Sequence, residues 1–327
     1  MIRVRWVAMR RGRGVPLALV VVALAAAGAA SSQNGRRRVL LGVLGDPVRF
    51  QALTGQASDA RLRFVGWGQG ATYGLPFAAL FRTMRTVPIL GLTTSLRNGG
   101  QITPRQIALG DGDGYLVAVN HAIHAWGREI FLRPFAEMDG HWNPACAYDA
   151  DGSRRDSSHT TALFRAAFAR TYLIAHGGPR VDATLAELGQ PPARGALYAN
   201  PHVQVIWNPQ GAGSPDVSGN SAAAYYPGDS YVDVVADDLY DIGYNPDWAD
   251  ANALYAAHPT KPFAFGEWAP WNIDDAGFVA RMAAFVRTHS RVVLISYYSG
   301  RAGGLFDLAR KPKALAAYRA LIAPLNR

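Results

Sequence analysis

The stretch IFLRPFAEMDGHWNP, residues 130–144, decides how the rest of the chain is interpreted. It begins with an almost continuously apolar run and ends in charged and aromatic side chains around Glu137. A run that is apolar on both faces is typical of a parallel strand covered by helices, whereas a half-exposed antiparallel strand alternates. The stretch therefore predicts a buried parallel strand over residues 129–137 that closes with a carboxylate.

Similar runs recur along the chain and alternate with helical patterns at 114–127, 161–178, 276–290 and 314–325. This alternation continues from residue 37 onward with no Pro/Ser-rich linker and no internal repeat. It predicts a single (β/α)8 TIM barrel, of class α/β, with an open doubly wound sheet as the alternative. The expected strands are RRVLLGVLG (37–45), LRFVGWG (62–68), VPILGLTTS (87–95), EIFLRPFAE (129–137), VQVIWNP (203–209), YVDVVADDLY (231–240), PFAFGEW (262–268) and RVVLISYYS (291–299).

The first thirty residues differ in composition from the rest. Five arginines precede the apolar run VPLALVVVALAAAGAA (15–30), which ends in small residues. This layout predicts a secretory signal over residues 1–30 and export of the protein, with an uncleaved membrane anchor as the alternative. We expect a short basic linker at 31–38 and a catalytic domain at 39–327.

The bulk composition fits a globular domain, with 49% hydrophobic and 17% charged residues. The five arginines of the signal account for five of the nine net positive charges, which leaves +4. We therefore expect no nucleic-acid partner, no membrane contact after signal removal, and a monomer. Cys146 is the sole cysteine, so it forms no internal disulfide, and we expect it to be buried. His121 and His124 lack an apparent third metal ligand, and we expect no metal and no cofactor.

Two glutamates stand at matching strand ends, Glu137 in the fourth expected strand and Glu267 in the seventh. In a barrel, the carboxyl ends of these strands face each other across the mouth. Glycoside hydrolysis needs two such carboxyl groups, one as acid and one as nucleophile or base. An ion pair with Arg133 or a helix cap would explain one glutamate alone. Both together, among aromatic side chains, favour a glycosidase with Glu137 and Glu267 as its catalytic pair.

Aromatic side chains gather at the same strand ends, and the apolar C–H faces of sugar rings stack on such groups. A buried Trp or Tyr is usually a core residue, but a cluster at several strand ends favours a carbohydrate site. The candidate substrate-binding residues are Arg133, Asp139, Trp142, Trp207, Tyr240, Trp268, Trp271 and Tyr297.

LRPFAEMDGHWNP resembles the acid/base segment of glycoside hydrolase family 26, which includes β-mannanases and enzymes for related β-glycans. FAFGEWAP, VIWNPQG and YYPGDSYVDVVADDLYD are similar to the nucleophile, fifth and sixth strands of that family. The resemblance implies Glu137 as acid/base, Glu267 as nucleophile and Tyr240 as the group that orients the nucleophile. It also implies a polysaccharide or oligosaccharide substrate and retention of configuration.

The chain departs from the family pattern at two positions. Ala136 stands where the family usually has His, and Asp139 where it usually has Asn. The first change leaves mannan specificity open, and we expect the second to raise the pKa of Glu137 by like-charge repulsion. The alternatives are a non-catalytic carbohydrate-binding barrel and a hydrolase of a bacterial cell-wall or exopolysaccharide glycan.

Overall fold

The computed structural model describes residues 38–68 and 76–325. The described residues belong to a single compact unit. The expected signal (1–30) and linker (31–38) lie outside them, apart from Arg38, so both stay predictions. Within the described ranges, no helix combines the length and the apolarity needed to cross a membrane.

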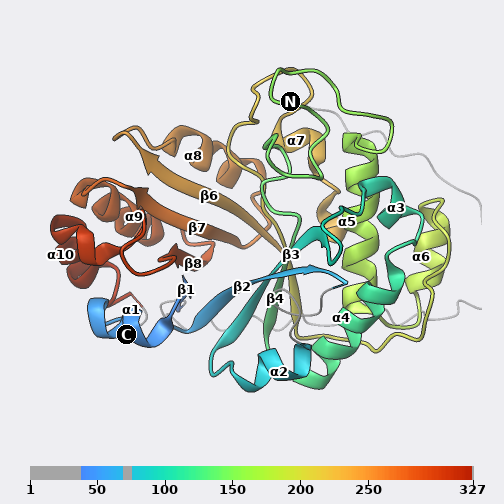
Figure 1. Cartoon of the computed structure of the whole chain (residues 1–327), viewed down its shortest axis with the longest axis horizontal. Coiled ribbons are helices and arrows are strands. Elements are labelled where there is room, and N and C mark those ends of the chain that lie inside the picture. The colour runs from blue at the N-terminus through green and yellow to red at the C-terminus, as the bar shows by residue number, and fades with distance from the viewer. Residues whose placement is uncertain (1–37, 69–75, 326–327) are drawn as a thin grey trace, which may run out of the picture. The chain divides into compact units, whose positions relative to one another are not determined.

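Eight parallel strands of the described residues pair in chain order and close into a barrel through β8 and β1 (Figure 1). Closure confirms the (β/α)8 prediction and excludes the open doubly wound sheet, because an open sheet leaves two edge strands unpaired. Each expected strand is present. The strands are β1 (Leu40–Leu44), β2 (Ala60–Trp67), β3 (Val87–Leu96), β4 (Ile130–Pro134), β5 (Val203–Trp207), β6 (Val234–Ile242), β7 (Phe263–Trp271) and β8 (Val292–Tyr298).

Helices cover the barrel, with α3 to α6 gathered on one side and α8 to α10 on the other (Figure 1). The expected helical patterns correspond to α4, α5, α9 and α10. The helix α5 shows why its bounds fall where they do: the Thr160 hydroxyl caps its first turn, and Gly177 ends it with positive φ. The helices are α1 (Pro47–Thr54), α2 (Phe77–Arg82), α3 (Pro104–Ala108), α4 (Asp113–Trp126), α5 (Thr161–His176), α6 (Val181–Glu187), α7 (Ala222–Tyr225), α8 (Trp248–Ala257), α9 (Ala276–Thr288) and α10 (Pro312–Leu321), with 3-10 turns η1 (Asp229–Tyr231) and η2 (Leu308–Arg310).

Alternate residues of the strands serve separate apolar cores, since successive side chains of a strand point to opposite faces. The barrel interior is filled by small and branched residues such as Leu62, Ile89, Ala236 and Ala264. The opposite faces of the strands pack under the helices in a larger cluster. This division decides which strand residues can reach the mouth of the barrel.

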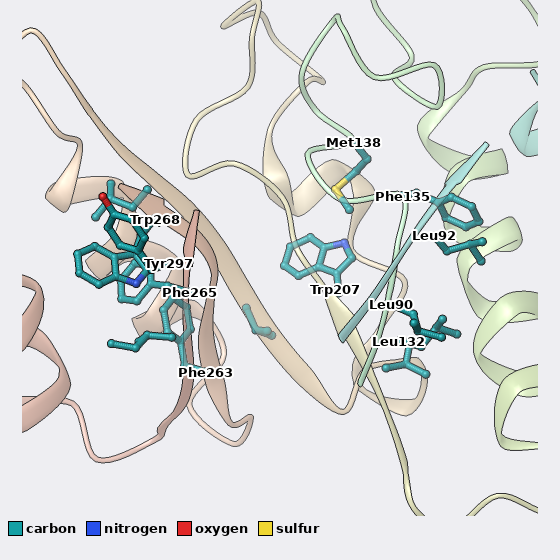
Figure 2. Packing of buried hydrophobic residues seen from close by; sticks show 14 of the residues in the cluster. Leu90, Leu92, Leu132, Phe135, Met138, Trp207, Phe263, Phe265, Trp268 and Tyr297 are labelled. Atoms are coloured by element: carbon teal, nitrogen blue, oxygen red, sulfur yellow. The ribbon is translucent and has the colours of Figure 1, made fainter. Parts of the chain in front are cut away.

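Trp207, Trp268 and Tyr297, expected as sugar contacts, lie in the outer cluster and are 0% exposed. Figure 2 shows Trp268 and Tyr297 packed beside Phe263 and Phe265, with Trp207 close to Met138. The structure thus places these three rings in the core between barrel and helices. Their positions follow from strand alternation, because each faces away from the barrel interior.

The carboxyl ends of β4 and β7 differ from the prediction by more residues than those of the other strands. The strand β4 ends at Pro134, not at 137, because Phe135 and Glu137 have φ values of 54° and 57°, which a strand cannot contain. The strand β7 runs on to Trp271, beyond the expected end at 268. The two glutamates therefore reach the mouth by different routes, one from a loop and the other from within a strand.

Candidate active site

A polar layer lies on top of the apolar barrel interior, toward the carboxyl ends of the strands. Arg133 follows the interior residue Phe131 by two positions on β4, and Asp238 follows Ala236 in the same way on β6. A spacing of two keeps a strand residue on the same face, so both side chains point into the barrel. Asn208, just past the end of β5, joins them by accepting a hydrogen bond from Arg133.

Arg133 is the centre of this layer and is 1% exposed. Its Nη1 donates to Oε1 of Glu267 at 2.7 Å, its Nε donates to Asn208 Oδ1 at 2.7 Å, and its Nη2 pairs with Asp238. Burial alone would lower the pKa of the guanidinium, but the charges of Asp238 and Glu267 outweigh it and raise the pKa. Arg133, expected as a sugar contact, is thus a buried cationic partner of Glu267.

A β-bulge aims Glu267 into the barrel. Asp237 of β6 pairs with Phe265 of β7, whereas Asp238 pairs with Glu267, so one residue of β7 is skipped. The skipped residue is Gly266, where a Cβ atom would lie 2.1 Å from Asn208 Oδ1 and 2.8 Å from Arg133 Nε. Bulges re-aim side chains in this way, and here only glycine leaves room for the polar layer.

Glu267 is 6% exposed, and its carboxylate is held at both oxygens. Arg133 donates to Oε1, and the Tyr240 hydroxyl donates to Oε2 at 2.6 Å. Burial and the charge of Glu267 raise the pKa of Tyr240, so the phenol keeps its proton and acts as the donor. This contact is the one that the family resemblance implies for Tyr240.

Glu137 reaches the mouth from the loop that follows β4. Its left-handed backbone is anchored by its own N–H, which donates to the Asn208 carbonyl at 2.7 Å, and by Phe135 N–H, which donates to the Leu92 carbonyl at 2.9 Å. Such conformations cost about 1–3 kcal/mol per residue and persist where surrounding contacts impose them. The Trp142 indole N–H donates to Glu137 Oε2 at 2.8 Å.

The surroundings of the two carboxyl groups are opposite in character. Burial and the nearby charge of Glu267 raise the pKa of Glu137 above its ordinary value, although Trp142 and Arg133 counteract this. Glu267 instead has a guanidinium at 2.7 Å and a phenol at 2.6 Å. The site therefore contains one carboxyl group suited to hold a proton and one bound by a cation and a phenol.

Asp139 lies behind the acid loop rather than in the mouth, and it is 0% exposed. Its Oδ1 accepts a hydrogen bond from Gln210 N–H at 2.9 Å, and its Oδ2 has no partner among the described residues. Burial raises the pKa of Asp139 to about 7. The neighbouring charge that chiefly raises the pKa of Glu137 is Glu267, where the sequence had suggested Asp139.

Of the expected aromatic contacts, Trp142 and Trp271 are the exposed ones, at 50% and 39%. Trp142 lies beside Glu137, and the Trp271 ring packs edge-on against Tyr240 at 5.5 Å between ring centroids. Tyr240 is half-buried between Trp271 and Glu267. One exposed ring thus lies beside Glu137, and the other packs on the tyrosine that binds Glu267.

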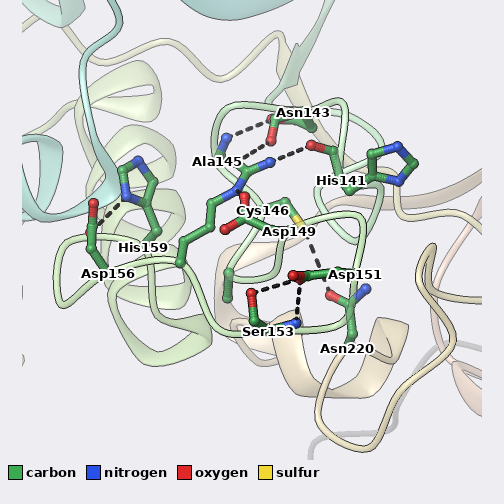
Figure 3. A network of polar contacts seen from close by, with 12 residues as sticks. His141, Asn143, Ala145, Cys146, Asp149, Asp151, Ser153, Asp156, His159 and Asn220 are labelled. Carbon is green, nitrogen blue, oxygen red and sulfur yellow. Dashed lines mark hydrogen bonds and ion pairs between the residues drawn. The ribbon is translucent and has the colours of Figure 1, made fainter.

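The loop that carries Glu137 and Trp142 continues into a polar network (Figure 3). The Asn143 side chain accepts from Ala145 N–H at 2.8 Å, and Cys146 contacts Asn220. Arg155 donates to the carbonyls of His141 and Asn143, the residues on either side of Trp142. Trp142 is therefore held by its neighbours' backbone as well as by Glu137.

Several site residues escaped the sequence analysis. Asn208 and Asp238 complete the polar layer, and Phe306 packs against Tyr240 at 5.5 Å. A signal for Asp238 was present, because consecutive acidic residues inside an apolar strand need a buried partner. Phe306 lies in an irregular loop whose pattern contains no such signal.

Other sequence predictions concern metals and the cysteine. Among residues 38–68 and 76–325, no three His, Cys, Asp or Glu side chains are grouped to hold a metal. His121 contacts the Ala196 carbonyl at 2.8 Å, and His124 stacks on Tyr198 at 4.2 Å. Cys146 is buried, as expected.

No protein-family model matches the chain. Endoglucanase H of Acetivibrio thermocellus is 26% identical over 291 residues, which cover 84% of this chain but only 28% of that protein. This chain therefore spans less than a third of the length of that curated relative.

Solved structures of similar fold include several mannanases. Bacillus subtilis mannanase has a TM-score of 0.56 and 18% identity, covering 86% of this chain and 85% of its own. The modular endo-β-1,4-mannanase of Cellulomonas fimi has a TM-score of 0.61 and 16% identity, covering 89% and 74%. A Bacteroides ovatus family 26 β-mannanase has a TM-score of 0.57 and 12% identity, covering 89% and 90%. The chain shares the (β/α)8 barrel of these mannanases, among which are family 26 enzymes of the kind that its motifs resemble.

Proposed function

We propose that this protein is a glycoside hydrolase that cleaves a β-linked polysaccharide, mannan or a related β-glycan, with retention of configuration. The observation that carries the proposal is the unlike pair of carboxyl groups in one barrel mouth. Glu137 has a raised pKa, and Glu267 is bound by Arg133 and Tyr240. A retaining glycosidase needs this division between a protonated acid and an ionised nucleophile.

In the first step, a carboxylate oxygen of Glu267 attacks the anomeric carbon while Glu137 gives its proton to the glycosidic oxygen. The C–O bond breaks, and the shortened glycan leaves as an alcohol. In the second step, ionised Glu137 takes a proton from water, and the resulting hydroxide attacks the anomeric carbon. The bond to Glu267 then breaks, which returns both carboxyl groups to their starting states.

The remaining site residues have separate parts in this scheme. Trp142 and Trp271 offer exposed rings for sugar stacking, and Trp142 also fixes the Glu137 carboxyl group. Tyr240 and Arg133 hold Glu267 for attack. As attack proceeds, Glu267 loses its charge, and the hydrogen bonds at its two oxygens fix which oxygen faces the sugar.

We further propose that the protein is exported and acts as a monomer, with no nucleic-acid partner. The support is the basic-then-apolar pattern of residues 1–30 and the small net charge of the remainder. Secretion of a tagged full-length chain into the culture medium tests export, and its mass by light scattering tests whether it is a monomer.

The first experiment is reducing-sugar release from a panel of β-glycans by the wild type, Glu137→Ala and Glu267→Ala. We expect release from at least one glycan, lowered about 10²–10⁴-fold in Glu137→Ala and further in Glu267→Ala. Glu187→Ala, on the exposed end of α6, is the matched control and should match the wild type.

Azide then separates the two roles on an aryl glycoside of the sugar that the panel identifies. With Glu137→Ala, azide should restore turnover and give a glycosyl azide of unchanged configuration, because two displacements still occur. With Glu267→Ala, azide should give the inverted product by a single displacement. Binding without release by the wild type on every glycan would contradict the proposal and favour the non-catalytic carbohydrate-binding barrel.

A further inference from the structure

We propose that Lys311 is a positioning residue for Glu267, acting through the loops that pack around Tyr240. This inference rests on the proposed function, and it concerns a residue outside the barrel mouth. Lys311 comes just before α10 and is 3% exposed. An amine of this type is seldom buried without a specific partner.

The Lys311 amine bridges two loops at the mouth. Its Nζ donates to the Pro270 carbonyl at 2.6 Å and to the Leu305 carbonyl at 2.5 Å. Pro270 lies at the end of β7, and Leu305 lies in the loop after β8. The Leu305 carbonyl also accepts from Asn272 N–H at 3.0 Å, which gives the two loops a second connection.

Each bridged carbonyl comes immediately before a ring that contacts Tyr240. Trp271 follows Pro270 and packs edge-on on Tyr240, and Phe306 follows Leu305 and packs on Tyr240, both with centroids 5.5 Å apart. Trp271 and Phe306 also contact each other at 4.8 Å. The Tyr240 ring is therefore held between rings whose backbone is fixed by one ammonium group.

The position of the Tyr240 ring in turn affects Glu267, the proposed nucleophile. The Tyr240 hydroxyl donates to Glu267 Oε2 at 2.6 Å, a contact that a small tilt of the ring would lengthen. A displacement of about 1 Å at a reacting group can cost on the order of 10²-fold in rate. Lys311 is thus connected to Glu267 by successive contacts. Its amine binds the carbonyls of Pro270 and Leu305, the rings that follow these residues pack on Tyr240, and the Tyr240 hydroxyl binds Glu267.

Burial lowers the pKa of Lys311 to about 8, while Asp307 and Asp274 counteract this. Most of the amine is therefore charged at pH 7, and charged donors make the stronger hydrogen bonds to carbonyls. Replacing Lys311 by Met keeps an unbranched apolar side chain, one atom shorter, but removes every donor.

The chain offers a matched control in Lys261. Its Nζ also donates to two carbonyls, those of Asp229 at 2.6 Å and Val232 at 2.7 Å. Lys261 lies before the start of β7, at the end of the barrel opposite to the mouth. Lys261→Met therefore removes the same chemistry without touching the rings around Tyr240.

The test compares Lys311→Met and Lys261→Met, each alone and with Tyr240→Phe, on the best glycan substrate. We expect Lys311→Met to lower kcat about tenfold with little change in KM, and Lys261→Met to leave kcat within about twofold. In the Tyr240→Phe background, where no phenol remains to be positioned, Lys311→Met should lower kcat less than about threefold. Equal effects in both backgrounds, or an unchanged kcat, would overturn the proposal.

Two further measurements cover other outcomes. If Lys311→Met does not fold, Lys311→Gln and Phe306→Leu replace it, since each alters one link of the same path, and the same non-additivity with Tyr240→Phe is expected. Amide hydrogen exchange of residues 268–272 and 301–306 needs no activity and should become faster in Lys311→Met but not in Lys261→Met. If the wild type hydrolyses no glycan, the proposed function is wrong. If amide hydrogen exchange is unchanged in Lys311→Met, Lys311 does not hold the two loops together.

Discussion

Arg133 and Arg170 are both almost completely buried, yet they belong to regions of different kinds. Arg170 on α5 binds Asp113 of α4 through two hydrogen bonds, of 2.8 and 2.5 Å, and donates to the carbonyls of Pro191 and Pro192. Arg133 inside the barrel divides its donors among Asn208, Asp238 and Glu267.

The two regions differ in how completely the acidic partners of each arginine are enclosed by the protein. Asp113 is 0% exposed; Arg170 donates to both of its carboxylate oxygens, and Arg194 N–H donates to Oδ2 as well. Glu267 keeps 6% exposure at the barrel mouth, and Asp238 Oδ1 has no partner among the described residues. A buried ion pair therefore does not by itself mark a site. The informative feature is a buried acid whose contacts stop short of closing it off from the mouth.

Removing each guanidinium tests the difference between the two regions. Arg133→Met should lower kcat by at least about 10³-fold, because Glu267 loses the cation that fixes its Oε1. Arg170→Met should leave the activity of folded protein within about threefold but lower the free energy of unfolding by about 3–5 kcal/mol. Denaturant unfolding and kinetics on the same preparations separate the effects. Similar kinetic losses in both variants would remove the distinction.

Asp139 extends the comparison to a buried acid that has no arginine partner. Its pKa of about 7 lies above the unfolded value of about 3.9, so the folded state binds the proton more tightly. The stability from the protonated form is complete below pH 4 and is lost as pH rises through 7.

At pH 8, the free energy of unfolding of Asp139→Asn should therefore exceed that of wild type by about 1 kcal/mol or more. It should also depend less on pH between 4 and 7. Urea unfolding at a series of pH values measures this, with Asp113→Asn as the control that should be destabilised throughout. A stability profile of Asp139→Asn parallel to that of wild type would show that the carboxyl is ionised in the folded state.

The smallest expected effect concerns the loop between the barrel and Glu137. Ala136 lies between Phe135 and Glu137, whose backbones are both left-handed, and its side chain is partly exposed. Ala136→His should change the ratio of kcat/KM between two β-glycans by about threefold to tenfold, since one added hydrogen bond is worth about 1 kcal/mol. An unchanged ratio would place residue 136 outside the sugar-binding surface.

The sequence was informative where local pattern and chemistry agree. Apolar runs that alternate with helical patterns predicted every strand of the barrel, and the glutamates near the ends of two runs identified the carboxyl groups that we propose as the catalytic pair. The sequence pattern did not predict whether a side chain at a strand end faces the barrel mouth or the helices. Trp207, Trp268 and Tyr297 end apolar runs as Tyr240 does, but they face the helices. A bulge at Gly266 shifts the alternation by one residue, and no composition rule shows where a bulge falls.

The amino-acid pattern specified the alternation of strands and helices, the candidate pair Glu137 and Glu267, and the motifs that resemble those of family 26. These are properties of short segments, which hydrophobic periodicity and residue chemistry specify locally. Only the tertiary structure showed that Arg133 divides its donors among Glu267, Asp238 and Asn208, that Asp139 is buried behind the acid, and that Lys311 reaches the rings around Tyr240. Each of these depends on segments far apart in the chain, whose distances are set only when the barrel closes and burial fixes the side chains that remain at its mouth.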